Sequence, residues 1–209
     1  MITRFYFLRH AKSEALEKGI VQGEGLNIPL TAEGKAQARR AANYLVGTHF
    51  DTIFTSTAIR AVSTAEAIRQ FHKKTPCFQF SELNERSKGV AEGVLKKEFD
   101  KKYPNILADW SKEIDARPEG GENFEDVERR VMPVLNKHLQ EFPGKSILYV
   151  IHGNVIRVVL GHMLNIPYGK RARIKQDYCA LNGAVYDHDK GLWNIEFVNF
   201  KLGETGKWI

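Results

Sequence analysis

The sequence predicts an α/β fold, a three-layer α/β/α sandwich whose central sheet is mainly parallel. One observation carries this prediction. Short apolar runs that suit buried strands alternate along the chain with longer segments whose apolar residues recur at helical spacing. Alternation of this kind implies a parallel sheet covered by helices on both faces. A length of 209 residues fits a single domain, expected to span 1–209.

The expected strands cover residues 2–8, 51–55, 75–80 and 146–151, followed by two weaker ones around 184–186 and 193–200. Helices are expected over 32–46, 56–71, 122–141 and 155–164. Thr31 and Ser56 suit the caps of the first two helices, and Pro133 should bend the third or remove one of its backbone hydrogen bonds. In the second helix the apolar stripe should be Ile59, Val62, Ala65 and Ile68. Residues 87–121 are polar and lysine-rich, and we expect a lid-like excursion with one or two helices.

Composition excludes several classes of protein. No apolar run approaches the roughly 20 residues that span a bilayer, and the N-terminus lacks the features of a signal peptide, so no membrane partner is expected. The two cysteines, Cys77 and Cys179, stand far apart without a metal-ligand pattern, which fits a reducing cytoplasm. The net charge of +6 favours anionic ligands, but the basic stretch 170–175 lacks a nucleic-acid module. We therefore expect a solvated basic surface there, and no nucleic-acid partner.

Cationic side chains stand at three expected junctions between a strand and a helix. Arg9 and His10 follow the first strand, Arg60 lies one turn into a helix, and His152 ends the strand 146–151. Taken singly, each of these residues is more often structural than functional. The carboxyl ends of parallel strands share one edge of a sheet, so together the four side chains could surround one phosphate. We expect them to line one pocket.

At this point the sequence resembles the histidine phosphatase superfamily, which includes phosphoglycerate mutases. Residues 7–14 are similar to its "RHG" signature and residues 29–34 to its "PLTxxG" segment. Further similar segments follow in matching order, namely 55–65, 82–93, 119–133 and 152–153, so that the resemblance covers about residues 2–165. Several motifs in order are far more specific than one alone.

The resemblance implies a role for each matched residue. His10 would be the nucleophile that becomes phosphohistidine, and Glu85 the proton donor. Arg9, Arg60 and His152 would bind the phosphoryl oxygens. Substrate contacts are assigned to Ser13, Gln22, Gly153 and Asn154. The resemblance implies no metal and no cofactor, and no carboxylate cluster lies near these motifs.

The implied mechanism makes physical sense for these residues. Arg9 and Arg60 should lower the pKa of His10 by like-charge repulsion, which leaves its reactive nitrogen unprotonated. Its other ring nitrogen should donate to a backbone carbonyl and so fix the tautomer. The negative charge of a bound phosphate should raise the pKa of Glu85, which could then protonate the leaving group.

Departures from the family pattern favour a phosphatase acting on a small phosphorylated metabolite. Ala15 and Leu16 replace a tryptophan and an asparagine of the mutases, and the insertion after Glu85 is shorter than theirs. Two other departures are Val21 and Asn27, which replace an arginine and an aspartate often seen in phosphatase members.

Other interpretations stay open. The sequence His152-Gly153-Asn154 is similar to the mutase form of this motif, so a cofactor-dependent phosphoglycerate mutase remains an alternative. An inactive phosphate-binding module is a further, less favoured alternative. Ala11 stands where the family has glycine, and its methyl group could crowd a site that needs a positive φ angle. The segment 203–207 superficially resembles a kinase phosphate loop but lacks its spacing. The substrate and the oligomeric state are not encoded in any recognisable pattern.

Overall fold

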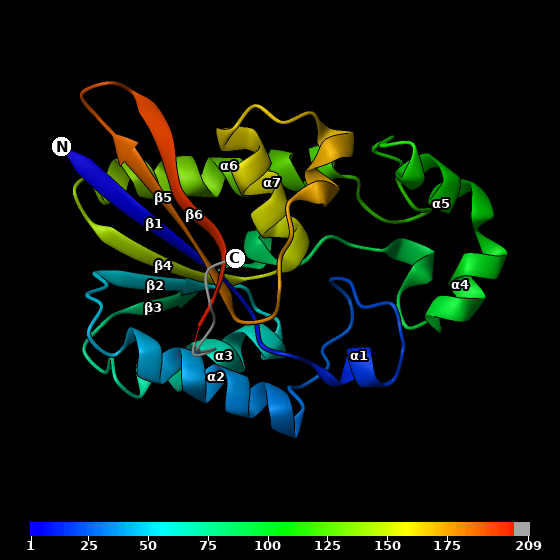
Figure 1. Ribbon diagram of the computed structural model, residues 1–209, viewed down its shortest axis with the longest axis horizontal. Helices are drawn as coiled ribbons and strands as arrows, with labels where there is room; N and C mark the ends of the chain where they lie inside the picture. The colour runs from blue at the N-terminus through cyan, green and yellow to red at the C-terminus, as the bar shows by residue number, and fades with distance from the viewer. Residues whose placement is uncertain (203–209) are drawn as a thin grey trace.

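The computed structural model describes residues 1–202 and has the predicted three-layer architecture (Figure 1). The segment 203–207, considered above as a phosphate loop, lies outside the described residues. Within them, six strands form one sheet in the order β3-β2-β4-β1-β5-β6. The strands are β1 Ile2–Arg9, β2 Thr52–Thr55, β3 Cys77–Gln79, β4 Ser146–Ile151, β5 Ala180–Asp187 and β6 Leu192–Lys201. Strands β3, β2, β4 and β1 run parallel, whereas β5 and β6 add antiparallel pairs at one edge.

The helices cover both faces of the sheet and the segment beyond its edge. They are α1 Glu14–Glu17, α2 Ala32–Leu45, α3 Ile59–Arg69, α4 Lys96–Lys102, α5 Pro104–Ser111, α6 Phe124–Glu141 and α7 Gly153–Met163. Three 3-10 turns join them, η1 Ser81–Leu83, η2 Gly89–Ala91 and η3 Tyr168–Arg173. Pro133 lies inside α6 without ending it. No helix within residues 1–202 has the length and apolarity needed to cross a membrane.

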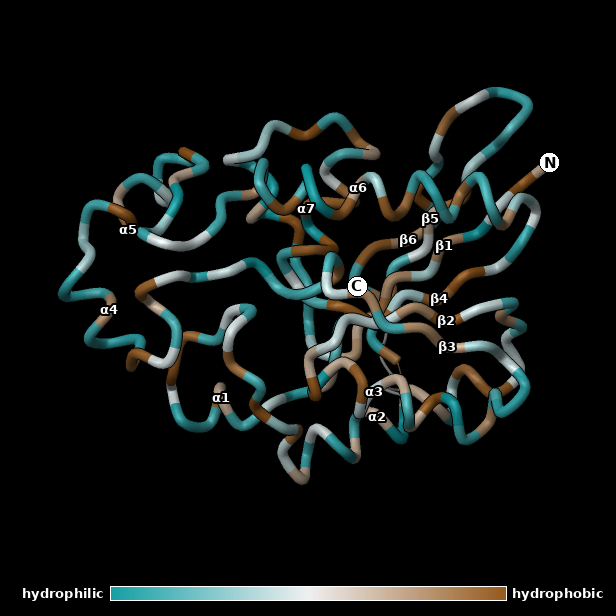
Figure 2. The backbone as a smooth tube through the Cα atoms, turned by 180° about the vertical axis from the view of Figure 1, so that it is seen from behind, coloured by the Kyte–Doolittle hydropathy of each residue, from teal (hydrophilic) through white to brown (hydrophobic). Residues whose placement is uncertain are grey.

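Alternation along the strands divides the core into two layers. Phe5, Phe7 and Tyr149 point to the face covered by α6 and α7. Leu148 and Val150 point to the opposite face, which α2 and α3 cover. Figure 2 shows hydrophobic segments running through the central strands. Because both faces of the parallel strands are buried, polar side chains can gather only at strand ends, and that is where the site forms.

The start of α3 differs from the prediction that Ser56 caps it. The N-cap residue is Ala58, which has no side chain able to cap, and Ser56 is turned away to contact His152. Instead, Asn27 reaches in from a distant loop, and its Oδ1 accepts a hydrogen bond of 2.7 Å from the backbone N–H of Ile59. The other predicted cap is confirmed, because Thr31 Oγ1 accepts a hydrogen bond of 2.9 Å from Gly34 N at the start of α2.

The predicted apolar stripe of α3 is also wrong at its first turn. Ile59 is 38% exposed, whereas Arg60 is 1% exposed. The helix is rotated so that Arg60 enters the site, and Ala61, Ala65 and Ile68 make the buried side of the later turns. Arg60 can occupy an inward position because its guanidinium donates hydrogen bonds to the carbonyls of Leu26 and Gly23.

The predicted excursion 87–121 contains η2, α4 and α5, which form a lobe beyond the carboxyl ends of the parallel strands (Figure 1). Phe99 is the buried anchor of this lobe, and its ring contacts those of Tyr103 and Trp110 at centroid distances of 5.2 Å and 6.1 Å. The lobe therefore has its own small aromatic core, and it stands next to the edge where the site lies.

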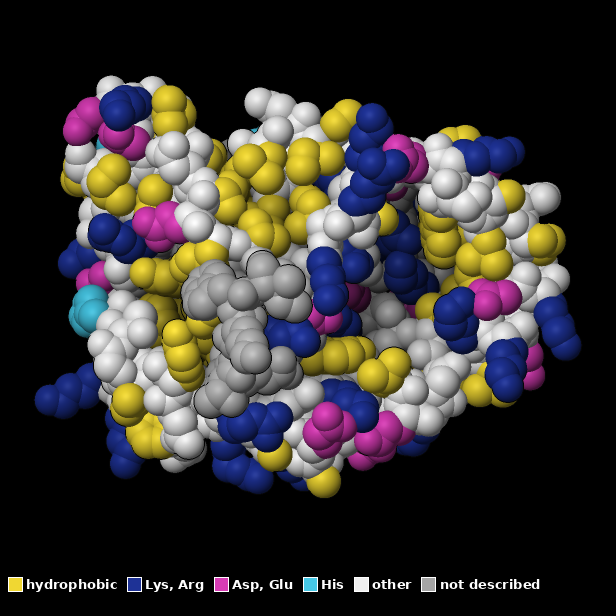
Figure 3. Space-filling model, viewed as in Figure 1, with side chains coloured by type: hydrophobic (Ala, Val, Ile, Leu, Met, Phe, Trp, Pro, Cys, Tyr) yellow, Lys and Arg dark blue, Asp and Glu magenta, His cyan; other side chains and the backbone are white. Residues whose placement is uncertain are grey.

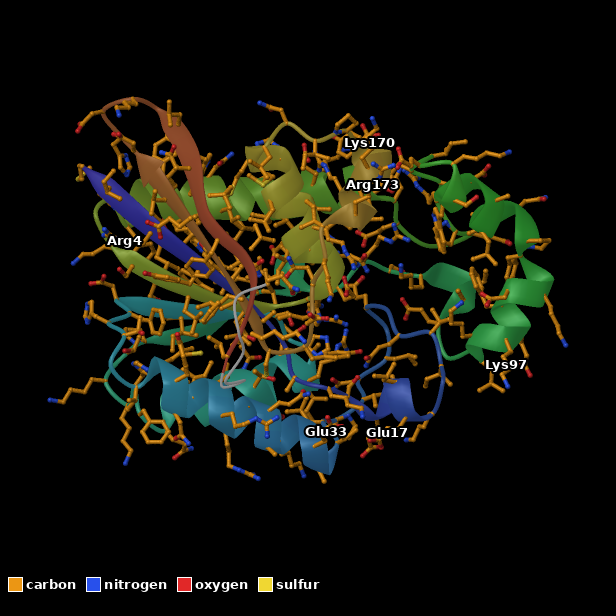
Figure 4. All side chains as sticks on the ribbon, in the orientation of Figure 1. Arg4, Glu17, Glu33, Lys97, Lys170 and Arg173 are labelled. Carbon is orange, nitrogen blue, oxygen red and sulfur yellow. The ribbon has the colours of Figure 1, made fainter. Side chains whose placement is uncertain are left out.

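The basic stretch 170–175 is only partly the solvated surface that we expected. Lys170 and Arg173 lie at the surface near the lobe (Figure 4). Arg171 is 5% exposed, however, and its guanidinium pairs with the carboxylate of Glu128. The expectation fails for Arg171 because η3 packs against α6 and α7, and a buried cation requires a partner.

Candidate active site

The carboxyl ends of β1 and β4 carry the two histidines of the site. Arg9 is paired with Ile151 in the parallel register, so His10 and His152 are the next residues on neighbouring strands. The backbone N–H of His10 donates a hydrogen bond of 2.9 Å to the carbonyl of Ile151, which extends the pairing by one residue. The two imidazole rings lie with their centroids 5.1 Å apart. The strand ends thus bring these residues together, as expected from the sequence.

His10 is buried and its tautomer is fixed. Its Nδ1 lies 2.8 Å from the carbonyl oxygen of Ala11, and because a carbonyl can only accept, Nδ1 must carry the proton. Burial, followed by the charges of His152, Arg60 and Arg9, holds the pKa of His10 well below its usual value. The imidazole is therefore neutral near pH 7, with Nε2 free of a proton.

Ala11 does not strain this arrangement. Its φ angle is not positive, its N–H donates to Thr64 Oγ1 at 3.1 Å, and its methyl group is fully buried in the layer under α2. The added methyl group therefore finds space without displacing the carbonyl that fixes His10.

His152 is fully buried and is held through one nitrogen. Its Nε2 lies 2.7 Å from Ser56 Oγ, whereas its Nδ1 is buried without a partner among residues 1–202. Burial, together with the charges of Arg60 and Arg9, lowers the pKa of His152 well below its usual value. A neutral histidine with one unsatisfied nitrogen in a cationic site is suited to contact an anion.

Arg60 is clamped by backbone carbonyls of the loop that follows α1. Its two terminal nitrogens donate hydrogen bonds of 3.0 Å to Leu26 O and of 3.0 Å to Gly23 O. The loop is in turn held by Glu92, whose carboxylate accepts hydrogen bonds from the N–H groups of Glu24 at 3.0 Å and Gly25 at 2.7 Å. Because carbonyls orient a guanidinium without neutralising it, Arg60 keeps its charge for a ligand.

Arg9 is fixed from the opposite side of the site. Its guanidinium donates a hydrogen bond of 2.6 Å to Gln176 O and lies 3.8 Å from the ring centroid of Tyr178. A Cβ atom at Gly153 would stand 3.3 Å from Arg9 Nε, so this glycine leaves space for the arginine. Gly153 is not among the residues that line the pocket, and its contact with substrate stays a prediction.

Glu85 is the carboxylate that faces these cations. It is 8% exposed, its Oε1 accepts a hydrogen bond of 2.9 Å from Arg86 N, and its Oε2 lies 3.5 Å from Asn154 N. Burial raises the pKa of Glu85, but the Arg86 N–H and the charges of Lys88, Arg60 and Arg9 outweigh it, so the pKa is lowered. Without a ligand, Glu85 is therefore ionised.

The site opens into a pocket of about 180 Å³. Its lining residues are Arg9, His10, Ala15, Leu16, Ile20, Gln22, Arg60, Glu85, Asn154 and Tyr178. Three of the four cationic residues expected to line one pocket are among them, whereas His152 is fully buried and does not line it. Figure 3 shows a hollow between the body of the molecule and the lobe, with basic side chains on its walls. Among residues 1–202, no group of three His, Cys, Asp or Glu side chains is placed to hold a metal ion.

Two of the four predicted substrate contacts line the pocket, Gln22 and Asn154. Ser13 is fully buried and reaches the site only through its hydroxyl, which donates a hydrogen bond of 2.7 Å to Gln22 Oε1. Sequence reasoning missed Tyr178, whose ring lies 5.6 Å from that of His10. No motif marks this tyrosine, which stands in the segment before β5 and reaches the site through the antiparallel pairing of β5 with β1.

Comparisons with known proteins agree with this geometry. A family model described as "Histidine phosphatase superfamily (branch 1)" matches residues 5–201. A 2,3-bisphosphoglycerate-dependent phosphoglycerate mutase of Rhizobium etli is 35% identical over 159 residues, covering 72% of this chain and 75% of that protein. An uncharacterized phosphatase, PhoE of Bacillus subtilis, is 32% identical over 160 residues, covering 76% of each chain. A solved mycobacterial glucosyl-3-phosphoglycerate phosphatase has the same fold, with a TM-score of 0.86 at 21% identity over 96% of this chain and 100% of that one.

Proposed function

We propose, from the premise that this chain belongs to the histidine phosphatase superfamily, that it is a metal-independent phosphomonoesterase acting on a small phosphorylated metabolite. One observation carries the proposal. The Nδ1 proton of His10 is held by the Ala11 carbonyl at 2.8 Å, which leaves an unprotonated Nε2 on a residue that shares its pocket with Arg9 and Arg60. We also propose that it acts in the cytoplasm, since Cys77 and Cys179 are free thiols.

In the first step, His10 Nε2 attacks phosphorus and the bond between phosphorus and the ester oxygen breaks. Arg9 and Arg60 bind the phosphoryl oxygens, and their guanidinium groups stabilise the charge that spreads over them in the transition state. If Ser56 donates to His152 Nε2, the proton of His152 stays on Nδ1, where it can be donated to a phosphoryl oxygen. The product of this step is phosphohistidine at His10.

The proton for the leaving oxygen comes from Glu85. This carboxyl group is ionised in the free enzyme because Lys88, Arg60 and Arg9 lower its pKa against the effect of burial. A phosphate bound among the same cations offsets their charge and raises the pKa, so Glu85 can hold a proton in the complex. In the second step the Glu85 carboxylate takes a proton from water, which attacks phosphorus and releases inorganic phosphate from His10.

Other carboxylates near the site are already bound elsewhere. Glu92 accepts hydrogen bonds from the N–H groups of Glu24, Gly25 and Lys88. Glu122 is paired with Arg130 at 2.8 Å, and Glu113 is paired with Arg173. None of these three lines the pocket, which favours Glu85 as the proton donor.

A phosphoglycerate mutase is the second candidate, favoured by the 35% identical relative from Rhizobium etli. The exposed side chain of Leu16 lines the pocket where the mutase pattern has asparagine, which favours hydrolysis. The two activities separate cleanly in one assay. With 3-phosphoglycerate and catalytic 2,3-bisphosphoglycerate, isomerisation should be slow or absent, whereas an aryl phosphate should be hydrolysed in the presence of EDTA. Rapid isomerisation would overturn the phosphatase assignment.

The nucleophile is tested by trapping the phosphoenzyme. Wild-type enzyme mixed rapidly with ³²P-labelled substrate should acquire an acid-labile label. His10→Ala should show neither this label nor any turnover. His49→Ala is the matched control because His49 is exposed and lies outside the pocket. A label that survives in His10→Ala would remove His10 from the nucleophilic role.

A further inference from the structure

Two uncharged groups hold the guanidinium of Arg9. Its Nη1 donates a hydrogen bond of 2.6 Å to Gln176 O, and its Cζ lies 3.8 Å from the ring centroid of Tyr178. Its Nε is buried and has no hydrogen-bond partner within residues 1–202. Neither a carbonyl nor an aromatic face cancels the charge of the cation, so this charge remains for a phosphoryl group. The position of Arg9 therefore depends on what fixes residues 176 and 178.

Gln176 is fixed by a buried amide pair with Asn182 of β5. Gln176 Nε2 donates a hydrogen bond of 2.9 Å to Asn182 Oδ1, and Asn182 Nδ2 donates one of 2.9 Å to Gln176 Oε1. Asn182 Nδ2 also donates a hydrogen bond of 3.0 Å to Phe7 O, on the strand that carries Arg9. Both amides are buried, so loss of either partner would leave polar groups unpaired away from water.

The neighbours of Asn182 decide which way its amide points. Phe7 O can only accept a hydrogen bond, so the atom beside it is Nδ2. The backbone N–H of Asn199 can only donate, here at 2.8 Å, so the atom beside it is Oδ1. This orientation requires Gln176 to present Oε1 to Nδ2 and Nε2 to Oδ1. The Asn182 amide thus uses both of its protons, and the Gln176 amide has one orientation that pairs with it.

Asn199 of β6 holds the residue between Gln176 and Tyr178. Its Oδ1 accepts a hydrogen bond of 2.6 Å from Asp177 N, and its Nδ2 donates one of 3.1 Å to Asp177 Oδ2. Asn199 has a φ of 56° and lies where the pairing of β5 with β6 shifts register, a conformation that asparagine tolerates better than most residues. The network thus joins three neighbouring strands, β1, β5 and β6 (Figure 1).

The segment that these amides hold is also tied to the backbone of Arg9. Cys179 N donates a hydrogen bond of 3.2 Å to Arg9 O. Tyr178 therefore lies between two residues that are each fixed by a hydrogen bond, Asp177 on one side and Cys179 on the other. Asn182 does not line the phosphoryl pocket, so it acts on the chemistry through other residues.

We propose that Asn182 is a positioning residue for Arg9. With Gln176 and Asn199 it forms a buried amide network, and this network holds the Gln176 carbonyl and the Tyr178 ring as a cradle for one guanidinium group. The inference rests on the proposed function, in which Arg9 binds the phosphoryl oxygens. A carboxylate in place of the cradle would pair with the cation and compete with phosphate, whereas an uncharged network orients the cation without reducing its charge.

A double-mutant cycle separates positioning from a general effect on folding. The rate of phosphoenzyme formation from 4-nitrophenyl phosphate is measured for wild type, Arg9→Ala, Asn182→Ala and the double variant. Asn182→Ala should lower the rate by about tenfold when Arg9 is present and by less than about twofold when it is absent, because its effect passes through Arg9. Asn194→Ala, at an exposed position on β6, is the control and should change neither rate.

The outcomes of the cycle distinguish the inference from the proposed function. Equal losses from Asn182→Ala in the two backgrounds would overturn the positioning role. A rate that Arg9→Ala leaves unchanged would instead overturn the part of Arg9 in the proposed function, and a wild-type enzyme that forms no phosphoenzyme would overturn that function altogether.

Asn199→Gly tests the same network at a position that tolerates the change. Glycine adopts a φ of 56° without strain and keeps the N–H that Asn182 accepts, so only the two hydrogen bonds to Asp177 are lost. The variant should slow phosphoenzyme formation when Arg9 is present and leave the rate of Arg9→Ala unchanged. Equal losses in both backgrounds would overturn the proposal, whether or not Asn182→Ala folds.

Free guanidinium gives a direct readout of the cradle. In Arg9→Ala, the Gln176 carbonyl and the Tyr178 ring face the space that the missing guanidinium occupied. Guanidinium chloride, far below denaturing concentrations, should raise the rate of phosphoenzyme formation in Arg9→Ala by about tenfold, whereas methylammonium chloride, which lacks the planar fork, should not. Adding Asn182→Ala or Asn199→Gly should abolish this rescue. Absence of rescue in Arg9→Ala, or equal rescue without the amide network, would overturn the proposal.

Discussion

The hydroxyl oxygen of Ser56 lies 2.7 Å from Nε2 of His152, and both residues are fully buried. This contact joins the ends of two neighbouring strands, β2 and β4, behind the phosphoryl pocket. A hydroxyl can donate to one imidazole nitrogen and so decide where the single proton of a neutral histidine resides. Ser56 is thus a positioning residue for His152.

Replacing Ser56 by alanine should leave the fold intact and slow phosphoenzyme formation by about tenfold, because His152 loses the partner that fixes its tautomer. Stopped-flow kinetics with 4-nitrophenyl phosphate give the rate, and ¹⁵N chemical shifts of the His152 ring report the tautomer. Ser81→Ala, at an exposed position in η1, is the control. An unchanged ring spectrum in Ser56→Ala would contradict this role.

Glu85→Gln should slow phosphoenzyme formation from an alkyl phosphate by about 10²–10⁴-fold, because a poor leaving group needs a proton. With 4-nitrophenyl phosphate, which releases a stable anion, the loss in this step should be much smaller. Binding of vanadate should persist, since an amide adds no repulsion. Rapid-quench measurements on both substrates give the comparison, with exposed Glu82→Gln as the control. Equal losses for both leaving groups would remove Glu85 from the acid role.

Stability should fall on acidification because several buried histidines are held neutral. His138 is 2% exposed, and burial lowers its pKa to about 4. The pKa of His138 is lower in the folded state than in the unfolded state. Its contribution to the free energy of unfolding is therefore complete above pH 6.5 and is lost as pH falls toward 4. Between pH 7.5 and 5.0 this costs about 2 kcal/mol. Urea unfolding should show a shallower pH dependence for His138→Asn than for wild type, and parallel curves would refute the assignment.

Gly23→Ala should weaken phosphate binding by about tenfold through Arg60. A Cβ atom at Gly23 would meet Glu92 Oε1 at 2.0 Å and Lys88 N at 2.9 Å, so the loop whose carbonyls hold Arg60 must shift. Inhibition by inorganic phosphate measures the change. Gly47→Ala is a matched control, because nothing lies within 4 Å of its Cβ. Identical inhibition constants in the two variants would show that the loop does not position Arg60.

The strands and the residues at their ends could be predicted from the sequence. Apolar runs identified β1, β2 and β4, and the parallel register then brings His10 beside His152 because each directly follows its strand. Two late strands were predicted over shorter spans than β5 and β6 have, and their antiparallel pairing was not predicted. These predictions were correct for one reason. Each depends only on the apolar pattern of a few consecutive residues, which shows where a strand begins and ends.

The remaining parts of the site depend on contacts between distant segments. Ser56 has the side chain of a helix cap, but His152 competes for its hydroxyl and Asn27 caps α3 instead. Lys88 lies in a polar segment whose composition predicts exposure to solvent. Only its packing beside Trp110 and Arg86 makes it part of a cavity wall. Helical periodicity likewise could not show that Arg60 faces inward, because its partners are carbonyls 34 and 37 residues away.

The proton acceptor for His10 belongs to the main chain. Any residue at position 11 supplies the same carbonyl, so glycine or alanine there leaves the protonation state of the nucleophile unchanged. The protonation state instead depends on the path of the backbone after β1, which the hydrogen bond from Ala11 N–H to Thr64 Oγ1 holds in place. The tautomer of His10 is therefore set by the backbone at the end of β1 and does not depend on the side chain at position 11.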